Sequence, residues 1–405
     1  MSYSPSKKTL EKYADVLVNF ALNDGKGIKK GDTVRIVCHE EAKDLYRALR
    51  LAVIKAGGYV IGAYLPSSDG TFEKDFYNHA SDAQLNHFPK KYMEGLMEEI
   101  DHQIVIISEM NKQALKGIDP EKIMKTRAAM KPYMELRRAK ENKGKFTWTL
   151  ALYGTEPMAK EVGMTLKEYW QEIIKACYLN TKDPVAKWRE VFAELSHYQK
   201  KLNTIAKKAL WYHVEGVDAD LWIKAGEKRA WMGGSGRNIP SFELFTSPDW
   251  RGTKGWIRFD QPLYQYGVIV EGIELHFEKG KVVTATATKN EKTLKAMIAQ
   301  KNADKVGEFS MTDKRFSRIT RFMAETLYDE NVGGPFGNTH IALGAAYHDC
   351  YSGNPAKVTK GEWRKLGYND SPIHTDMVST SDRTITAHLK DGSTQVIYKD
   401  GKYQV

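Results

Sequence analysis

The chain has 405 residues, of which 41% are hydrophobic and 28% are charged, and this ordinary composition excludes a disordered chain. Its length exceeds the size at which one hydrophobic core stops growing, so we expect two domains. Lysine and arginine outnumber aspartate and glutamate by 61 to 51, but acids interrupt the basic residues throughout. We therefore interpret the positive charge as solvated surface and do not expect a nucleic-acid partner.

Three cysteines, Cys38, Cys177 and Cys350, lie far apart in the sequence and form no CxxC pair. This spacing argues against a disulfide framework and against a thiolate zinc site, and it predicts free thiols. The N-terminal segment has no continuous apolar region, and no window reaches the ~18 apolar residues of a spanning helix. We therefore expect a soluble cytoplasmic protein without a membrane partner.

The first part of the chain alternates between helical and strand-like patterns. Apolar residues recur at helical spacing from Leu10 to Leu22, and Gly25 and Gly27 end that helix. The segment "GDTVRIVCH" then predicts a buried strand, "EEAKDLYRALRLAVIKAGG" a helix, and "YVIGAYL", "HQIVIIS" and "KFTWTLALYG" further strands. Alternation of this kind predicts a doubly wound α/β domain over residues 1–185.

A nucleotide-binding role for this domain is not favoured. The turn after the first strand, "CHEEAKD", contains neither GxGxxG nor GxxxxGK[ST]. The segment from Leu166 to Ala209 is rich in helix-forming residues, and Asn180, Asp183 and Pro184 indicate that a helix restarts there. We place the domain boundary between residues 185 and 186.

Residues 186–405 contain short alternating segments typical of strands, such as "WIRFDQPLYQYGVIVEGIELHFEKGKVVTATAT". Turns at Lys279-Gly280, Asp391-Gly392 and Asp400-Gly401 favour hairpins. We also expect helical insertions over Thr293–Ile298 and His340–Tyr347. The pattern predicts an α+β domain rich in antiparallel strands.

Acidic and imidazole side chains stand in apolar or glycine-rich surroundings within this second part. His374 and Asp376 lie two residues apart, so in a strand both would project to the same face. Buried carboxylates are costly unless paired, which favours a cation near them. The candidate ligands are Glu243, Glu308, Glu330, His340, His374 and Asp376. This carboxylate-rich set without thiolates suits a pair of divalent ions.

Each candidate also has a structural interpretation: Glu243 on an edge strand, Glu330 as a capping carboxylate, and His340 as a core histidine. Other tempting groups are interpreted as surface or loop residues, namely His276 beside Glu274, the run His348, Asp349 and Cys350, and the glycine-rich "GGSG".

Several motifs in the same order resemble the aminopeptidase T family of metallopeptidases. They are "GRNIPSFELFTSP", "GVIVEGIELHFEKGKVV", "VGEFSM", "LYDENVGGPFGNTHIALGAAY" and "IHTDM". "VGEFSM" is similar to a ligand-bearing turn of the family. The N-terminal half resembles the family more weakly, through "KYADVLVNFAL" and "LYRALRLAVIKAGG".

The resemblance implies a two-domain, homodimeric exopeptidase that removes N-terminal residues from short peptides. It implies that the six candidate ligands hold two divalent ions in a C-terminal catalytic domain, with Glu308 as the bridge and Tyr347 near the metals. The expected chemistry is hydrolysis by metal-bound hydroxide, with Tyr347 stabilising the developing oxyanion. Zinc or cobalt is expected, and oxygen and imidazole ligands would also accept manganese or magnesium.

Two other functions also agree with the sequence. A two-metal amidohydrolase acting on non-peptide amides would use similar ligands but would not require a free N-terminus. A basic nucleic-acid-binding protein would show steeply salt-dependent binding and no metal requirement.

Overall fold

The computed structural model describes residues 3–405, which form two compact units. The N-terminal unit contains the chain up to Arg189 together with Ser235–Ile239, and the C-terminal unit contains Glu190–Gly234 and Pro240–Val405. Helix α10 (Pro184–Ala206) begins at the proline where a helix restart was predicted. Assignment of catalysis to residues 186–405 remains a prediction.

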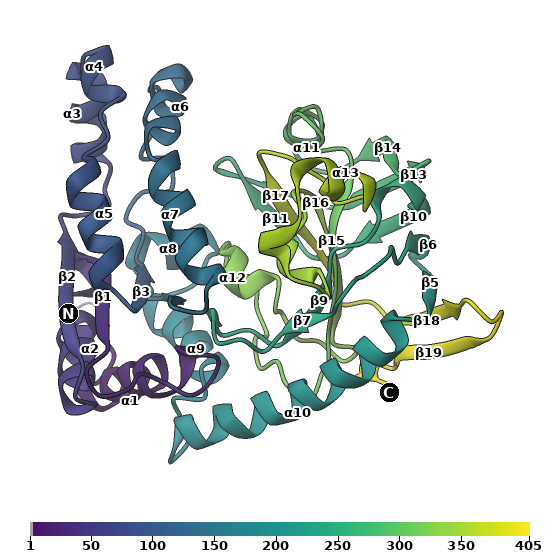
Figure 1. Cartoon of the computed structure of the whole chain (residues 1–405), viewed down its shortest axis with the longest axis horizontal. Coiled ribbons are helices and arrows are strands. Elements are labelled where there is room, and N and C mark those ends of the chain that lie inside the picture. The colour runs from purple at the N-terminus through teal and green to yellow at the C-terminus, as the bar shows by residue number, and fades with distance from the viewer. Residues whose placement is uncertain (1–2) are drawn as a thin grey trace. The chain divides into compact units, whose positions relative to one another are not determined.

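A five-stranded parallel sheet forms the centre of the N-terminal unit (Figure 1). Its strands follow the order β2-β1-β3-β4-β8, and every pairing is parallel. The strands are β1 (Thr33–His39), β2 (Tyr59–Leu65), β3 (His102–Ile107), β4 (Thr147–Leu152) and β8 (Asn238–Ile239). The predicted α/β fold of this part is therefore confirmed.

The helices of this unit begin and end where local chemistry favours it. Ser6 caps the first helix by accepting a hydrogen bond from the amide of Thr9, and Thr165 with Glu168 forms a capping box on another. The helices are α1 (Lys7–Val16), α2 (Lys43–Lys55), α3 (Thr71–His79), α4 (Asp82–Leu85), α5 (Lys90–Glu99), α6 (Pro120–Ala129), α7 (Lys131–Asn142), α8 (Glu156–Glu161) and α9 (Leu166–Ala176), with the π-helical turn η1 (Leu17–Ala21) and the 3₁₀ turn η2 (Glu40–Ala42).

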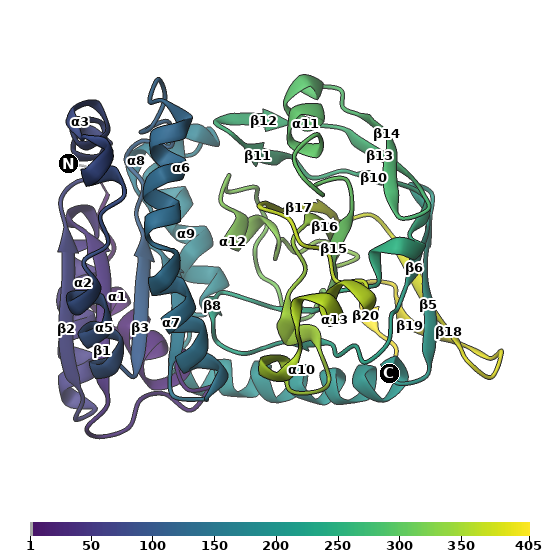
Figure 2. The same ribbon diagram turned by 45° about the horizontal axis from the view of Figure 1, so that its top comes forward.

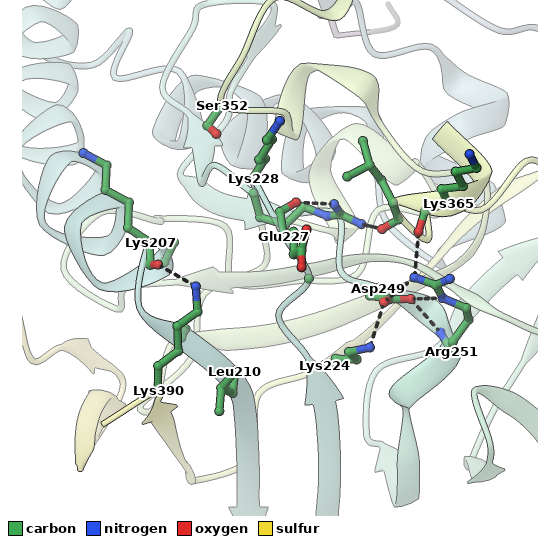
Figure 3. A pocket seen from close by; sticks show the side chains of 15 residues that line it. Lys207, Leu210, Lys224, Glu227, Lys228, Asp249, Arg251, Ser352, Lys365 and Lys390 are labelled. Atoms are coloured by element: carbon green, nitrogen blue, oxygen red, sulfur yellow. Dashed lines mark hydrogen bonds and ion pairs between the residues drawn. The ribbon is translucent and has the colours of Figure 1, made fainter. Parts of the chain in front are cut away.

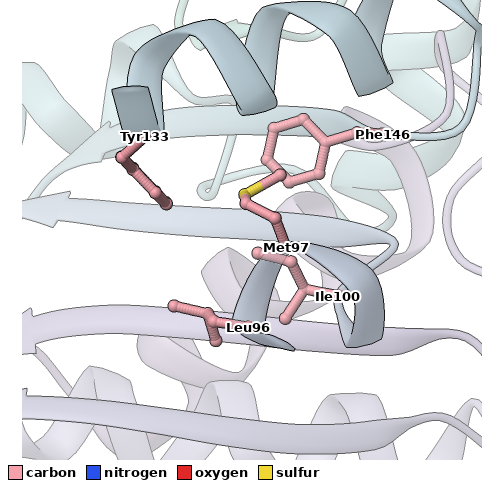
Figure 4. Packing of buried hydrophobic residues seen from close by; sticks show 5 residues of the cluster. All are labelled: Leu96, Met97, Ile100, Tyr133 and Phe146. Atoms are coloured by element: carbon pink, nitrogen blue, oxygen red, sulfur yellow. The ribbon is translucent and has the colours of Figure 1, made fainter. Parts of the chain in front are cut away.

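Apolar side chains pack the helices onto the sheet. Strand β1 alternates buried and half-buried residues, with Val34, Ile36 and Cys38 fully buried on one face. Figure 4 shows a second cluster, in which residues of α5 and α7 meet the start of β4. Its buried members are Leu96, Met97, Ile100, Tyr133 and Phe146.

The C-terminal unit contains two larger antiparallel sheets (Figure 2). The first has eight strands in the order β14-β13-β10-β6-β5-β18-β19-β20. Its strands are β5 (Ala209–Gly216), β6 (Ala219–Lys224), β10 (Lys254–Phe259), β13 (Ile273–Glu278), β14 (Lys281–Thr286), β18 (Arg383–Leu389), β19 (Thr394–Lys399) and β20 (Lys402–Tyr403). The predicted hairpins are present, and Lys279 and Gly280 both adopt positive φ, as a tight two-residue turn requires.

The second sheet has five strands in the order β17-β16-β15-β9-β7. These are β7 (Met232–Gly233), β9 (Glu243–Thr246), β15 (Val306–Thr312), β16 (Asn338–Gly344) and β17 (His374–Ser379). A small hairpin joins β11 (Leu263–Gln265) to β12 (Val268–Val270). The remaining elements are α11 (Glu291–Ile298), α12 (Thr326–Asp329), α13 (Lys360–Lys365), η3 (Trp250–Gly252), η4 (His348–Cys350) and η5 (Pro355–Lys357).

Three sequence-based expectations about this unit need correction. The helix expected over His340–Tyr347 is wrong, because Asn338–Gly344 form strand β16. Every residue of β16 is buried, polar and apolar alike, so the strand lacks the alternation that identifies a half-buried strand. The segment around Glu308 is likewise a strand and not a turn. Cys350 is fully buried and is not a surface residue.

The three cysteines are free, as predicted, and all three are buried. Among residues 3–405, none of the helices is long and apolar enough to cross a membrane.

Candidate metal centre

Four neighbouring strands carry five of the six candidate ligands on one face of the five-stranded sheet. Glu243 begins β9, Glu308 lies in β15, His340 in β16, and His374 with Asp376 in β17. Side chains two residues apart on a strand share a face, which is why His374 and Asp376 point to the same place. The segment is a strand, so the condition under which the two side chains share a face is met.

The register of the sheet leaves space between these side chains. Ala342 of β16, which lies between β15 and β17, is directly opposite Glu308 on one side and Asp376 on the other. Gly344, two residues further, lies opposite His374. Because residues directly opposite each other share a face, the small side chains of β16 form a floor beneath the larger polar ones.

The ligand atoms form two groups that share Glu308. One group contains Glu243, Glu308 and His340, and the other contains Glu308, His374 and Asp376, with the ligand atoms of each group within 4.8 Å of one another. Glu308 uses different oxygens for the two groups, because its Oε1 lies 3.3 Å from His340 Nε2 and its Oε2 lies 3.6 Å from His374 Nε2.

The remaining distances complete the two groups. The Nε2 atom of His340 lies 3.2 Å from Glu243 Oε2 and 3.8 Å from Asp376 Oδ1. The Nε2 atom of His374 lies 3.4 Å from Asp376 Oδ1. Both imidazoles therefore direct the same ring nitrogen toward carboxylate oxygens.

Hydrogen bonds behind the ligands fix their orientation. The Nδ1 atom of His374 lies 2.8 Å from the carbonyl oxygen of Ala345; as a donor to that carbonyl, Nδ1 carries the proton and leaves the Nε2 lone pair free for a metal ion. The hydroxyl of Ser310 donates to Glu243 Oε2 over 2.8 Å. Such outer contacts orient metal ligands in proteins.

Asn331 performs a similar task for the loop that carries Glu330. Its side-chain amide donates to Glu330 Oε1 at 3.3 Å, and its side-chain oxygen accepts from the backbone amide of Phe242 at 2.7 Å. Sequence analysis assigned no role to Ser310 or Asn331. Ser310 could have been found from its position two residues after Glu308, on the same strand face.

Burial and mutual repulsion shift the ionisation of these groups. Burial, with the nearby charge of Glu243, raises the pKa of Glu308 to about 7, and burial and the neighbouring acids also raise the pKa of Glu330 well above its usual value. Burial would lower the pKa of His374, but Asp376 and Glu308 beside it raise that pKa to about 9.

The other two groups respond to the same neighbours. Burial opposes the charged imidazole of His340, yet hydrogen bonds to Glu243 and Glu308 raise its pKa. Burial would raise the pKa of Asp376, but the charge of His374 lowers it. Thus four carboxylates with two imidazoles create a buried site with a strong preference for positive charge.

Glu330 and Tyr347 lie at the margin of this cluster. Glu330 follows α12 and belongs to neither group of ligand atoms, although its charge interacts with those of Glu243, Asp376, His340 and Glu308. The ring of Tyr347 lies 4.6 Å from that of His374, and its backbone amide donates to Ser247 Oγ. Partial burial and the nearby carboxylates raise the pKa of the Tyr347 phenol, so it is a hydrogen-bond donor at neutral pH.

The donor set fits divalent metal ions. Oxygen and imidazole nitrogen atoms on a rigid sheet, all facing one small space, are ligands that zinc and related ions accept. The groups interpreted as surface residues do not join them: His276 pairs with Glu274 at 2.8 Å on β13, and His348 stacks on Trp363 with ring centroids 3.9 Å apart.

Comparison with known proteins gives a family and a fold. A family model described as thermophilic metalloprotease (M29) matches residues 6–403. Aminopeptidase PepS from Streptococcus thermophilus is 29% identical over 425 residues, covering 98% of both chains. Aminopeptidase T from Thermus thermophilus is 27% identical over 426 residues, covering 98% of this chain and 99% of the other.

Solved structures share the fold. The structure of wild-type AmpT from Thermus thermophilus matches with a TM-score of 0.80 and 24% identity, covering 98% of this chain and 100% of the other. A 2,5-dihydroxypyridine dioxygenase from Pseudomonas putida KT2440 matches with a TM-score of 0.54 and 12% identity, covering 99% and 98%. Since the second protein is named for a different reaction, the fold alone does not select the chemistry.

Proposed function

The chain belongs to the M29 family of thermophilic metalloproteases and is a metal-dependent aminopeptidase, and we propose that its centre is dinuclear. The observation that carries this proposal is the position of Glu308, whose two oxygens face two separate groups of ligand atoms. The proposed ligands are Glu243, Glu308, Glu330, His340, His374 and Asp376. Glu308 would offer one carboxylate oxygen to each of the two ions.

Charge balance supports two ions. When both imidazoles are neutral, the four carboxylates carry four negative charges, which two divalent cations neutralise. A single divalent ion would leave two buried carboxylates without compensation, at a cost that burial makes high. The positions of the ligand atoms also support two ions, because each of the two groups contains atoms from three different side chains.

The bound ions would polarise the peptide carbonyl and lower the pKa of a water molecule. The protein's own residues position the reaction. The strands β9, β15, β16 and β17 hold five of the six proposed ligands, and the hydrogen bond from His374 to the Ala345 carbonyl keeps that imidazole in one tautomer. Tyr347 offers a protonated phenol beside His374, from which it can donate a hydrogen bond to the oxyanion that forms during hydrolysis.

Exopeptidase action requires a group that receives the free amine of the substrate. Either a carboxylate of the site or one of the bound ions would receive this amine. We propose short peptides as substrates, zinc or cobalt as the metal, and a homodimer as the assembly. The last two proposals come from the resemblance to the aminopeptidase T family and not from the geometry.

Single variants of the ligands test the site. His374→Ala and Glu308→Ala should stay folded, shown by an unchanged far-ultraviolet circular dichroism spectrum, and should lose hydrolysis of aminoacyl-nitroanilides. His276→Ala is the matched control, since His276 pairs with an acid on a strand of the same unit outside the candidate site. Full activity of a purified His374→Ala or Glu308→Ala protein would remove the site assignment.

Metal analysis tests the number and identity of the ions. Chelation should abolish activity, and addition of zinc or cobalt should restore it with two ions bound per chain. A stoichiometry of one ion per chain in a fully active protein would refute the dinuclear proposal.

A further inference from the structure

The C-terminal unit contains a cavity that lies outside the candidate metal centre. The metal centre is rich in carboxylates, whereas this cavity is lined mainly by cationic side chains. Its volume is about 550 Å³, which is within the size range of small-molecule pockets. Figure 3 shows its lining, which the end of α10, the loop after β6, α13 and the turn after β18 provide. None of the proposed metal ligands lines it.

Positive charge dominates this cavity. Seven of the lining side chains are cationic and two are acidic. The cationic residues are Lys207, Lys224, Lys228, Arg229, Arg251, Lys365 and Lys390, and the acidic ones are Glu227 and Asp249. Like charges that line one cavity repel each other and raise the positive potential there.

The two arginines serve the structure of the cavity wall. The Arg229 guanidinium donates to the carbonyl oxygens of Ser247, Glu227, Pro248 and Leu366. Arg251 forms a bidentate pair with Asp249 at 2.7 Å for both bonds, and Lys224 reaches the same carboxylate at 3.1 Å. These contacts use up the acidic charge of Asp249 and hold the wall rigid.

Three lysines that line the cavity have ammonium groups without a protein partner among the described residues. Within residues 3–405, the ammonium groups of Lys207, Lys228 and Lys365 make no hydrogen bond or ion pair with the protein, and all three residues are exposed. The ammonium group of Lys390 donates to the carbonyl oxygen of Lys207 at 3.3 Å. Glu362 lies near Lys228 and Lys365, but its carboxylate already accepts hydrogen bonds from Thr359.

The backbone at Lys228 adds a second observation. Lys228 has φ of +53°, a left-handed conformation that favours glycine or asparagine over lysine. Its carbonyl oxygen accepts from the amide of Ser352 at 2.9 Å, which fixes the turn next to the cavity. A long cationic side chain thus stands at a backbone position where lysine is unfavourable, on the rim of a cavity rich in positive charge.

We propose that this cavity binds a small polyvalent oxyanion, such as a diphosphate or a tricarboxylate, through Lys207, Lys228, Lys365 and Lys390. Lysine ammonium groups bind such anions as point charges. A small ligand fits better than a nucleic acid, because the lysines line one cavity of about 550 Å³ and the lining contains no aromatic side chain on which a base could stack.

Calorimetric titration with pyrophosphate, and separately with citrate, tests the proposal. At low salt both should bind the wild-type protein, whereas monovalent acetate should bind far more weakly, and added NaCl should weaken binding. The variant Lys228→Asn combined with Lys365→Ala should bind about tenfold more weakly, because two charge contacts are lost. Asparagine at position 228 tolerates the left-handed backbone, so the variant should fold.

A matched control separates this site from general surface charge and from the metal centre. Lys281→Ala combined with Lys402→Ala removes two exposed lysines of the same unit that do not line the cavity, and it should bind both anions like the wild type. Absence of binding to the wild type, or equal affinity of the cavity variant and the control, would overturn the proposal. If the anions bound only at the metal centre, the cavity variant and the control would bind them with equal affinity.

Two further outcomes are informative. If an oligonucleotide or an acidic peptide bound more tightly than pyrophosphate and lost affinity in the cavity variant, the ligand would be a macromolecule and the proposal of a small anion would be wrong. Peptide hydrolysis by the cavity variant should equal that of the wild type in the absence of anion. The proposal of an anion site can therefore fail while the proposed dinuclear centre holds, and the reverse is also true.

Discussion

Replacement of Glu308 by glutamine is expected to abolish activity and at the same time to stabilise the metal-free protein. The carboxylate is buried among other acids, and its pKa rises from 4.5 to about 7. A change of this size corresponds to about 3 kcal/mol that the ionised group costs the folded state. Glutamine has nearly the same shape and carries no charge, so this cost disappears in the variant.

The sign of the effect depends on pH. Because the folded pKa lies above the unfolded value, the destabilisation is absent below pH 4.5, grows between pH 4.5 and about 7, and is complete above that range. At pH 8 the metal-free Glu308→Gln protein should therefore unfold roughly 6–12 °C above the metal-free wild type, the shift expected for about 3 kcal/mol in a unit of this size. At pH 4.5 the two proteins should unfold together.

Thermal unfolding of both proteins after chelation, followed across this pH range, measures the difference. Glu278→Gln is the control, since Glu278 is exposed at the end of β13, and its removal should leave the unfolding temperature unchanged. With metal added, the order should reverse, because ions bound to the folded wild type stabilise it by mass action. A metal-free Glu308→Gln protein that is less stable than the wild type at pH 8 would refute the reasoning.

Four other perturbations have defined outcomes. A peptide with a free N-terminus should be hydrolysed and its N-acetylated form should not, as product analysis would show; cleavage of both would favour a general amidohydrolase. Ser310→Ala removes the hydroxyl that donates to Glu243 and should weaken metal binding about tenfold in a competitive chelator titration; unchanged affinity would contradict the assigned role. Gly307→Ala places a β-carbon 2.3 Å from the Ala345 carbonyl oxygen and should cost about 2 kcal/mol in chemical denaturation. Asp218→Ala leaves the buried guanidinium of Arg383 unpaired and should cost about 3 kcal/mol, whereas the exposed Asp220→Ala should not.

Much of the fold could be predicted because its signals are local. Strand β1 alternates apolar and polar residues, and a proline marks the start of α10, so both appear in the pattern of the sequence. The strand β16 could not be recognised in this way, because it is covered on both faces and its run of apolar residues also suits a helix. The two-residue strand β8 is too short to leave any pattern.

The candidate site also has one part that the sequence could reveal and one part that it could not. His374 and Asp376 could be paired from their spacing alone, since a two-residue step on a strand fixes a common face. The convergence of Glu243, Glu308 and His340 depends on which strands are neighbours, and no spacing in the sequence contains that information. The role of Ala342 could not be predicted either. Its small side chain matters because Glu308 and Asp376 lie opposite it, and the sequence does not show which residues are opposite.

The path of the chain through residues 235–239 has a consequence for synthesis on the ribosome. The parallel sheet of the N-terminal unit acquires its last strand, β8, only after β5, β6 and β7 have been made. The nascent N-terminal unit must therefore wait with an incomplete sheet edge at β4 while the next segment emerges. The same detour means that no single cut of the gene separates the two units cleanly.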